Sequence, residues 1–131
     1  MRILHTYHKG LPEHRIECEA FVAKQAGYRV YFLGMGSKAE PELDVFESIR
    51  TLRALNNRQV VKDRKIRQEW KKAVLEINPD IIHANDIIAA KYSSETGFPM
   101  LYDDREYWTK QRIQYDIWPL WKRIAIRPFT T

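Results

Sequence analysis

Short apolar segments alternate with segments of helical periodicity along most of this 131-residue chain. The short segments are rich in Ile, Leu, Val, Tyr and Phe, which favour strands, whereas the longer ones repeat apolar residues at a helical period. We predict strands at 2–7, 29–33, 45–49, 81–84 and 99–102, and helices at about 12–26, 57–77 and 87–96. Alternating strands and helices joined by short loops form a parallel sheet with helices on both faces, so we expect a doubly wound α/β fold.

Helix ends and buried positions follow from the same pattern. We place Pro12 at the first helical position, and we expect Gly27 to end the first helix. The apolar face of that helix is predicted to be Ile16, Ala20, Val22 and Ala23. The strand residues that we expect to be buried are Ile3, Leu4, Val30, Phe32, Ile81, Ile82 and Leu101.

Composition and length favour a single domain spanning residues 1–131. Hydrophobic residues make up 44% and charged residues 30%, which is ordinary for a soluble globular protein. No segment approaches the roughly 18 to 20 uninterrupted apolar residues of a membrane span, and the first residues lack the pattern of a signal peptide. Cys18, the only cysteine, excludes an internal disulfide and is interpreted as a small packing residue. A lone cysteine fits the reducing cytoplasm, so we expect a cytoplasmic protein.

Positive charge is concentrated in two segments of a chain whose net charge is +5. Segment 58–72 holds seven Lys/Arg against two Asp/Glu, and segment 107–131, a helical end rich in aromatic residues, holds five against one. Two interpretations of the second segment stay open. Its basic and Trp residues fit contact with an anionic membrane surface, as in a peripheral protein at the inner membrane face. Its apolar stripe also fits packing within the protein.

Polar residues follow three of the predicted strands. In open α/β sheets, ligands bind at the carboxyl ends of the strands, near the point where strand order reverses. That rule selects the loops 8–10, 85–86 and 103–106. The side chains there or at the next helix start that could bind hydroxyls or handle protons are His8, His14, Asp86, Asp104 and Glu106.

Two further positions have alternative interpretations. Gly10 either lets the backbone approach a ligand at a helix start or forms a simple turn, and no dinucleotide-binding or P-loop fingerprint surrounds it. His83 is either a ligand or base, or a strand histidine that hydrogen-bonds to the backbone. The four histidines show no metal-ligand spacing, so we assign no metal site.

Three segments, in order and at suitable spacing, resemble glycosyltransferase family 4 and related GT-B enzymes. MRILHTYHKG and AGYRVYFLG are similar to the opening strand, loop and second strand of that family. INPDIIHANDIIAA resembles its P-D-I-[IV]-H-x-H-[DE] strand and turn, and GFPMLYDDREYW resembles its P-x-V-Y-D-x-H-E-x-[YW] strand and loop. The resemblance covers essentially the whole chain.

The resemblance implies an N-terminal, acceptor-side domain with a Rossmann-like fold, one half of the GT-B architecture. In such enzymes a C-terminal domain, which carries an acidic donor-binding motif, holds most of the nucleotide-sugar. By resemblance, Gly10 matches the loop that approaches donor phosphate and acceptor. Asp86 matches the acidic turn at the cleft and is the catalytic candidate, while Asp103 and Glu106 match the D-x-x-E frame of the third segment.

Departures from the family pattern leave the acceptor class open. Asn85 stands where the family often has a second histidine, and Arg105 stands where a histidine often precedes the glutamate. We include both with His8, His14 and His83 among the acceptor-binding or cleft candidates. The first loop also lacks the usual paired glycines.

The expected partners follow from the resemblance. We predict a sugar or lipid-linked acceptor, a C-terminal donor domain and no nucleic acid. No cofactor is expected to bind tightly, although the full-length enzyme would use a nucleotide-sugar donor, and the isolated chain is expected to be inactive. Two alternatives remain: a stand-alone Rossmann-like binding or interaction module without catalysis, and half of a sugar-nucleotide epimerase.

Overall fold

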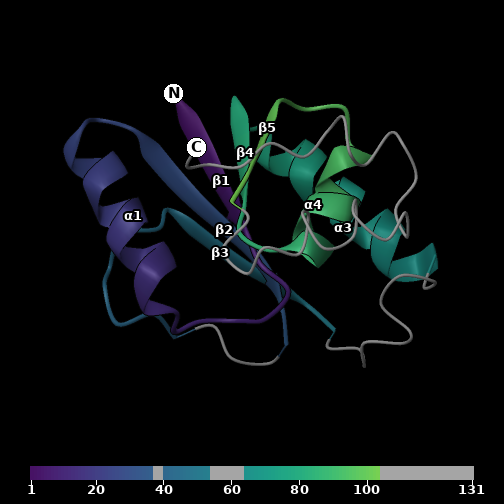
Figure 1. The fold of residues 1–131 in the computed structure, drawn as a ribbon, viewed down its shortest axis with the longest axis horizontal. Coiled ribbons are helices and arrows are strands. Elements are labelled where there is room, and N and C mark those ends of the chain that lie inside the picture. Colours follow the sequence, from purple (N-terminus) through teal and green to yellow (C-terminus); the bar gives the residue numbers. More distant parts are fainter. Residues whose placement is uncertain (37–39, 54–63, 104–131) are drawn as a thin grey trace, which may run out of the picture.

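A five-stranded, all-parallel sheet with flanking helices forms the fold of this chain (Figure 1). The computed structural model describes residues 1–36, 40–53 and 64–103. Its elements are β1 (Arg2–Thr6), α1 (His14–Gln25), β2 (Arg29–Met35), β3 (Ser48–Leu52), α3 (Arg64–Ile77), β4 (Ile81–Ala84), α4 (Ile87–Ser94) and β5 (Met100–Tyr102). The strand order is β3-β2-β1-β4-β5, which confirms the expected Rossmann-like α/β fold. Arg105, Glu106 and segment 107–131 lie outside the described residues.

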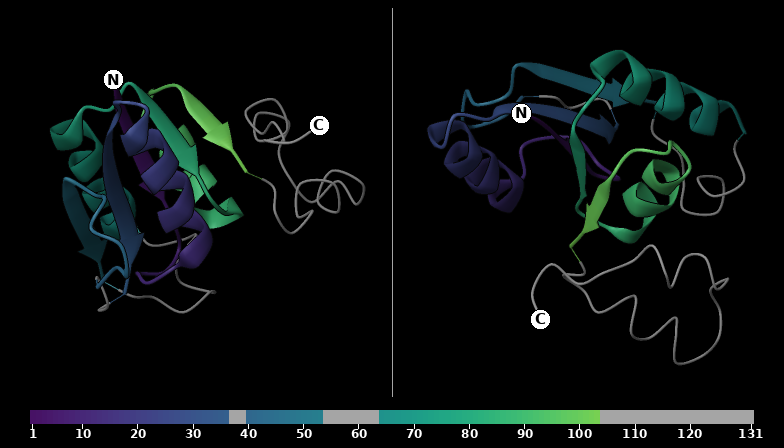
Figure 2. Two further views of the ribbon diagram at one scale, coloured as in Figure 1. Left: turned by 90° about the vertical axis from the view of Figure 1, so that its left-hand side faces the viewer. Right: turned by 90° about the horizontal axis from the view of Figure 1, so that it is seen from above.

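Two helical layers cover the sheet. Helices α3 and α4 pack on one face and α1 packs on the other, as the right-hand view of Figure 2 shows. The larger core lies under α3 and α4, where alternate strand residues such as Leu4, Leu33 and Ile82 meet Trp70 and Val74. A smaller core under α1 joins Leu11, Ile16 and Phe32. Among the helices of the described ranges, none is long and apolar enough to cross a membrane.

The starts of α1 and β3 differ most from the sequence predictions. Helix α1 begins at His14 because the Glu13 side chain accepts a hydrogen bond from the backbone N–H of Ile16 at 2.7 Å, which makes Glu13 the N-cap. Pro12 therefore precedes the helix instead of opening it. Gly27, with a φ of 95°, ends it as expected. Strand β3 begins at Ser48, later than predicted, and the described part of α3 begins at Arg64.

Most of the expected core residues are buried, and the exceptions have a topological cause. Ile3 and Ile81 are only half-buried, and Leu101 is 39% exposed. Strand β5 ends the strand order on its side, and α1 packs chiefly over β2, so Leu101 receives little cover on the α1 face. Val22 and Cys18 of α1 are also exposed, which makes the predictions of a packing role for both wrong.

Candidate functional site

The carboxyl ends of β1, β4 and β5 meet at one edge of the sheet. Thr6 lies opposite Ala84, and Ala84 lies opposite Tyr102. The ladder continues past the strands, because the N–H of Asn85 donates to the carbonyl of Thr6 at 3.0 Å and the N–H of Asp103 donates to that of Ala84 at 2.9 Å. The loops that the sequence selected therefore begin side by side, as far as the structure describes them.

A close contact between His8 and Asp86 joins the loops after β1 and β4. One carboxylate oxygen of Asp86, Oδ1, accepts a hydrogen bond from the N–H of Ala89 at 3.0 Å and caps the N-terminus of α4. The other, Oδ2, is paired with Nδ1 of His8. The side chains of His8 and Asp86 are 27% and 16% exposed, so solvent and ligands reach the pair. Asp86 therefore caps helix α4 and also contacts His8 at the cleft, because each of its two carboxylate oxygens has a different partner.

Asn85, predicted to bind a ligand at the cleft, turns its side chain into the sheet. Its Nδ2 lies 3.2 Å from the carbonyl oxygen of Thr6, 3.1 Å from that of His83 and 3.2 Å from Nδ1 of His5. The residue is buried. In this geometry Asn85 ties the end of β1 to the end of β4 and holds the His5 ring in place.

Histidines and carboxylates gather between the sheet and α1. His83 pairs with His5 across β1 and β4, and their ring centroids are 4.6 Å apart. Nε2 of His83 lies 3.6 Å from a carboxylate oxygen of Glu19 in α1 and 3.8 Å from one of Asp103. We call the following four residues the histidine–carboxylate cluster: His5, Glu19, His83 and Asp103.

Sequence reasoning selected His83 and Asp103 but missed the other two members of the cluster. The signal for His5 was its place on a predicted strand of the same sheet as the strand of His83. The sequence does not show which strands pair or in which register, and it is the register that sets His5 opposite His83. Glu19 lies on α1, one turn after Arg15, and its orientation depends on how that helix packs on the sheet.

Gly10 and His14 occupy the segment that leads from β1 into α1. The loop before Gly10 runs beside β2, where the N–H of Met35 donates to the carbonyl of Lys9 at 3.3 Å. His14 is exposed at the start of α1 and contacts the Cys18 thiol, with Nε2 3.5 Å from Sγ. The contact of His14 with Cys18 thus runs along its own helix and not toward Asp86.

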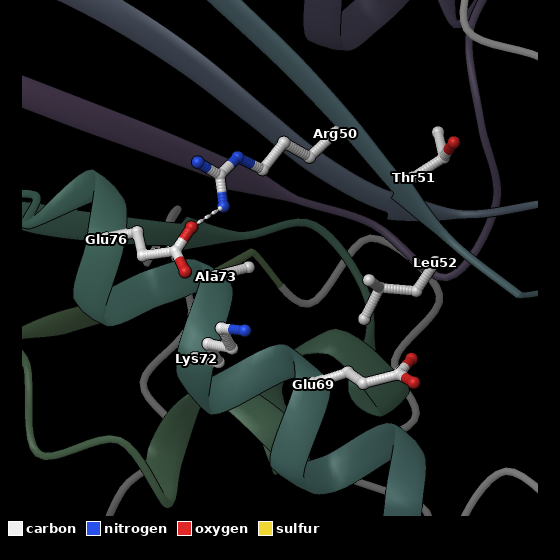
Figure 3. A pocket seen from close by; sticks show the side chains of 7 residues that line it. All are labelled: Arg50, Thr51, Leu52, Glu69, Lys72, Ala73 and Glu76. Carbon is white, nitrogen blue, oxygen red and sulfur yellow. Dashed lines mark hydrogen bonds and ion pairs between the residues drawn. The ribbon is translucent and has the colours of Figure 1, made fainter.

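An open groove lies apart from these residues, between β3 and α3 (Figure 3). Across it Arg50 donates to Glu76 at 2.6 Å, and both side chains are largely exposed. The hydrogen bond from Arg50 lowers the pKa of Glu76, so the pair is ionic at neutral pH. The remaining lining residues are Thr51, Leu52, Glu69, Lys72 and Ala73. Since its charges are mixed and partly paired, we do not assign the groove as the functional site.

Two replacements of Asp86 distinguish the contribution of its helix cap from that of its contact with His8. Asp86→Ala removes the helix cap and should lower the free energy of unfolding by about 1 kcal/mol, whereas Asp86→Asn keeps a capping oxygen and should cost less than about 0.5 kcal/mol. Urea unfolding followed by circular dichroism measures both. Equal losses in the two variants would mean that the pairing with His8, and not the cap, supplies the stability.

Comparison with known proteins supports the fold. Neither family models nor curated protein sequences match the chain. Among solved structures, the chain is similar to the UDP-GlcNAc 2-epimerase from Methanocaldococcus jannaschii, with a TM-score of 0.56 and 12% sequence identity. The match covers 95% of this chain and 36% of that enzyme, so the chain spans about a third of its length. That enzyme has a GT-B-like Rossmann fold, and the likeness extends to the fold alone.

Proposed function

We propose that this chain is the acceptor-side half of a nucleotide-sugar-dependent glycosyltransferase of GT-B architecture. The observation that carries the proposal is the position of the His8–Asp86 pair. Strands β2 and β3 follow one another on one side of β1, whereas β4 lies on the other side of β1. Strand order therefore reverses between β1 and β4, where ligands bind in open α/β sheets, and the pair stands at that point.

The pair has the chemistry that transfer to a hydroxyl requires. Asp86 holds the His8 ring through Nδ1, so the other nitrogen, Nε2, is the one that would accept the proton of an acceptor hydroxyl. The carboxylate then stabilises the imidazolium that forms. His8 becomes the base in this proposal, and Asp86, our catalytic candidate from the sequence, becomes its positioning residue.

A second domain would complete the reaction. Transfer needs donor and acceptor held together in the correct orientation, which supplies much of the rate. We infer that a C-terminal domain binds the nucleotide-sugar and that this chain alone transfers no sugar. A sugar or lipid-linked molecule is the proposed acceptor, and contact with an anionic membrane surface remains a proposal for segment 107–131.

Half of a sugar-nucleotide epimerase is the second candidate. The similarity to a UDP-GlcNAc 2-epimerase over 95% of the chain favours it. In that case the His8–Asp86 pair would handle a proton of the nucleotide-sugar itself instead of a proton of a separate acceptor. The two candidates therefore differ in which molecule reaches His8.

Ligand titration followed by NMR tests the proposal. We expect UDP-sugars to bind the chain weakly, with a Kd no better than about 1 mM, which corresponds to about −4 kcal/mol. Simple saccharides should shift the resonances of His8 and Asp86 if the chain binds an acceptor, whereas UDP-GlcNAc alone should shift them in the epimerase case. His8→Asn should remove the response, and His14→Asn, which changes an exposed histidine of α1, should keep it. Micromolar affinity for a UDP-sugar, or shifts confined to the groove of Figure 3, would contradict the proposal.

A further inference from the structure

Three members of the histidine–carboxylate cluster bring their donor atoms close together. His5, Glu19 and His83 each offer a nitrogen or carboxylate oxygen, and these atoms all lie within 4.8 Å of one another. The residues come from β1, α1 and β4, so a single ion there would link the sheet to the helix above it. This convergence involves other side chains than the His8–Asp86 pair and does not depend on the proposed function.

The spacings fit a small cation bound by nitrogen and oxygen. Zinc binds histidine nitrogen and carboxylate oxygen at about 2.0–2.2 Å, so tetrahedral ligand atoms stand roughly 3.4 Å apart. Nε2 of His83 is 3.6 Å from the Glu19 oxygen and 3.8 Å from the Asp103 oxygen. These two distances exceed the tetrahedral spacing by a few tenths of an ångström, and the ligand atoms of His5, Glu19 and His83 all lie within 4.8 Å of one another. We propose that the histidine–carboxylate cluster is a binding site for a divalent transition metal of the zinc type, with Asp103 as the fourth ligand.

The surroundings suit a metal site. His5, His83 and Asp103 are buried and Glu19 is partly exposed, so the site is enclosed on the sheet side and reached past α1. Two neighbouring side chains lie close to these residues. Asn85 lies against the His5 ring, and Arg15 lies 3.6 Å from Glu19 and 4.0 Å from Asp103.

Charge favours a divalent cation at this point. Glu19 and Asp103 bring two negative charges beside two imidazole rings. Arg15 stands at the rim, with a largely exposed side chain 3.6 Å from Glu19 and 4.0 Å from Asp103. A divalent cation between the carboxylates neutralises both. Histidine together with carboxylate is also the ligand set of several zinc enzymes.

Metal titration of the full chain tests the site. The protein is first stripped with a chelator and then titrated with zinc in competition with a chromophoric chelator, and separately with cobalt, whose visible absorption reports four-coordinate binding. We expect one metal ion per chain, and an affinity at least ten-fold weaker in both Glu19→Gln and His83→Asn. Zinc should raise the Tm of the parent protein and not that of Glu19→Gln.

A matched control removes the other pair that could bind zinc. His14 and Cys18 are in contact on the exposed side of α1, so the double variant His14→Asn, Cys18→Ser should bind zinc as the parent does. Because His83 is buried, its variant could fail to fold, but Glu19 is partly exposed and Glu19→Gln keeps the test valid. The proposal is overturned by the absence of stoichiometric binding, by unchanged affinity in Glu19→Gln, or by loss of binding in the His14, Cys18 variant.

Discussion

Trp70→Ala should lower the free energy of unfolding by about 3–5 kcal/mol, the usual cost of truncating a large buried aromatic side chain. Trp70 is fully buried where α3 meets α4 and the sheet. Its ring lies 5.4 Å from that of Tyr92, and its Nε1 donates to the hydroxyl of Ser93 at 3.3 Å. Alanine would leave a cavity and remove the hydrogen bond. Urea unfolding followed by far-UV circular dichroism measures the loss without relying on tryptophan fluorescence.

Leu75→Ala is the control on the same helix. The Leu75 side chain is 53% exposed, so little apolar surface returns to water and the change should stay within about 0.5 kcal/mol. Similar losses in the two variants would contradict the assignment of the core to the inner face of α3. A much smaller loss for Trp70→Ala would also mean that the α3–α4 layer contributes little to stability.

The sequence predicted the described part of helix α3 and its buried face correctly, whereas it placed β3 too early. The apolar residues of α3 repeat at helical spacing between charged ones, so the pattern marks both the helix and its buried face. Before β3, Val45 and Phe46 are apolar for another reason, since they pack against residues on the α1 side of the sheet. The hydrogen-bonded pairing of β3 begins after them, at Ser48. Composition alone does not distinguish apolar residues that pack on the sheet from apolar residues that belong to a strand.

The position of a strand within the sheet is also hidden from a local pattern. Leu101 has the same kind of sequence neighbourhood as a central strand residue, yet β5 pairs only with β4 among the described strands. Whether a strand residue is covered depends on which helix crosses above it. That is a property of the assembled layers, and it explains why Leu101 was the one strand residue of the expected core found exposed.

For the candidate site, the sequence predicted which loops meet but not which side chains touch. Parallel strands must end at a common edge, so the grouping of the loops after β1, β4 and β5 follows from the fold class alone. The pairing of His8 with Asp86 depends on loop geometry, and the meeting of His5 with His83 depends on register. A histidine spacing motif in the sequence could not have revealed the contact between His5 and His83, because the two residues lie on different strands.

Architecture alone does not choose between transferase and epimerase. GT-B folds support both when two Rossmann-like halves enclose a nucleotide-sugar, and fold does not imply function. The His8–Asp86 pair is compatible with either, because a histidine oriented by a carboxylate can take a proton from a hydroxyl or from carbon. The distinguishing feature is whether a second sugar reaches His8, which the NMR titration addresses directly.

Gly34→Ala should both destabilise the fold and disturb the candidate site. A Cβ at Gly34 of β2 would lie 2.3 Å from the backbone carbonyl oxygen of Lys9 and 2.7 Å from the Phe32 ring. The carbonyl belongs to the loop that carries His8, so relieving the overlap must move that loop away from β2. Overpacking of this kind costs about 3 kcal/mol, and the movement should break the pairing of His8 with Asp86.

Gly97→Ala is the matched control, since it adds the same methyl group elsewhere. No atom lies within 4 Å of a Cβ at Gly97, but its φ of +84° is unfavourable for alanine and should cost about 1–2 kcal/mol. Urea unfolding gives both losses, and the imidazole NMR signals of His8 report the state of the pair. Gly34→Ala should show the larger loss and shifted His8 signals, whereas Gly97→Ala should leave those signals in place. If Gly34→Ala kept the His8 signals of the parent, the close approach of the loop to β2 would not be what positions His8 for Asp86.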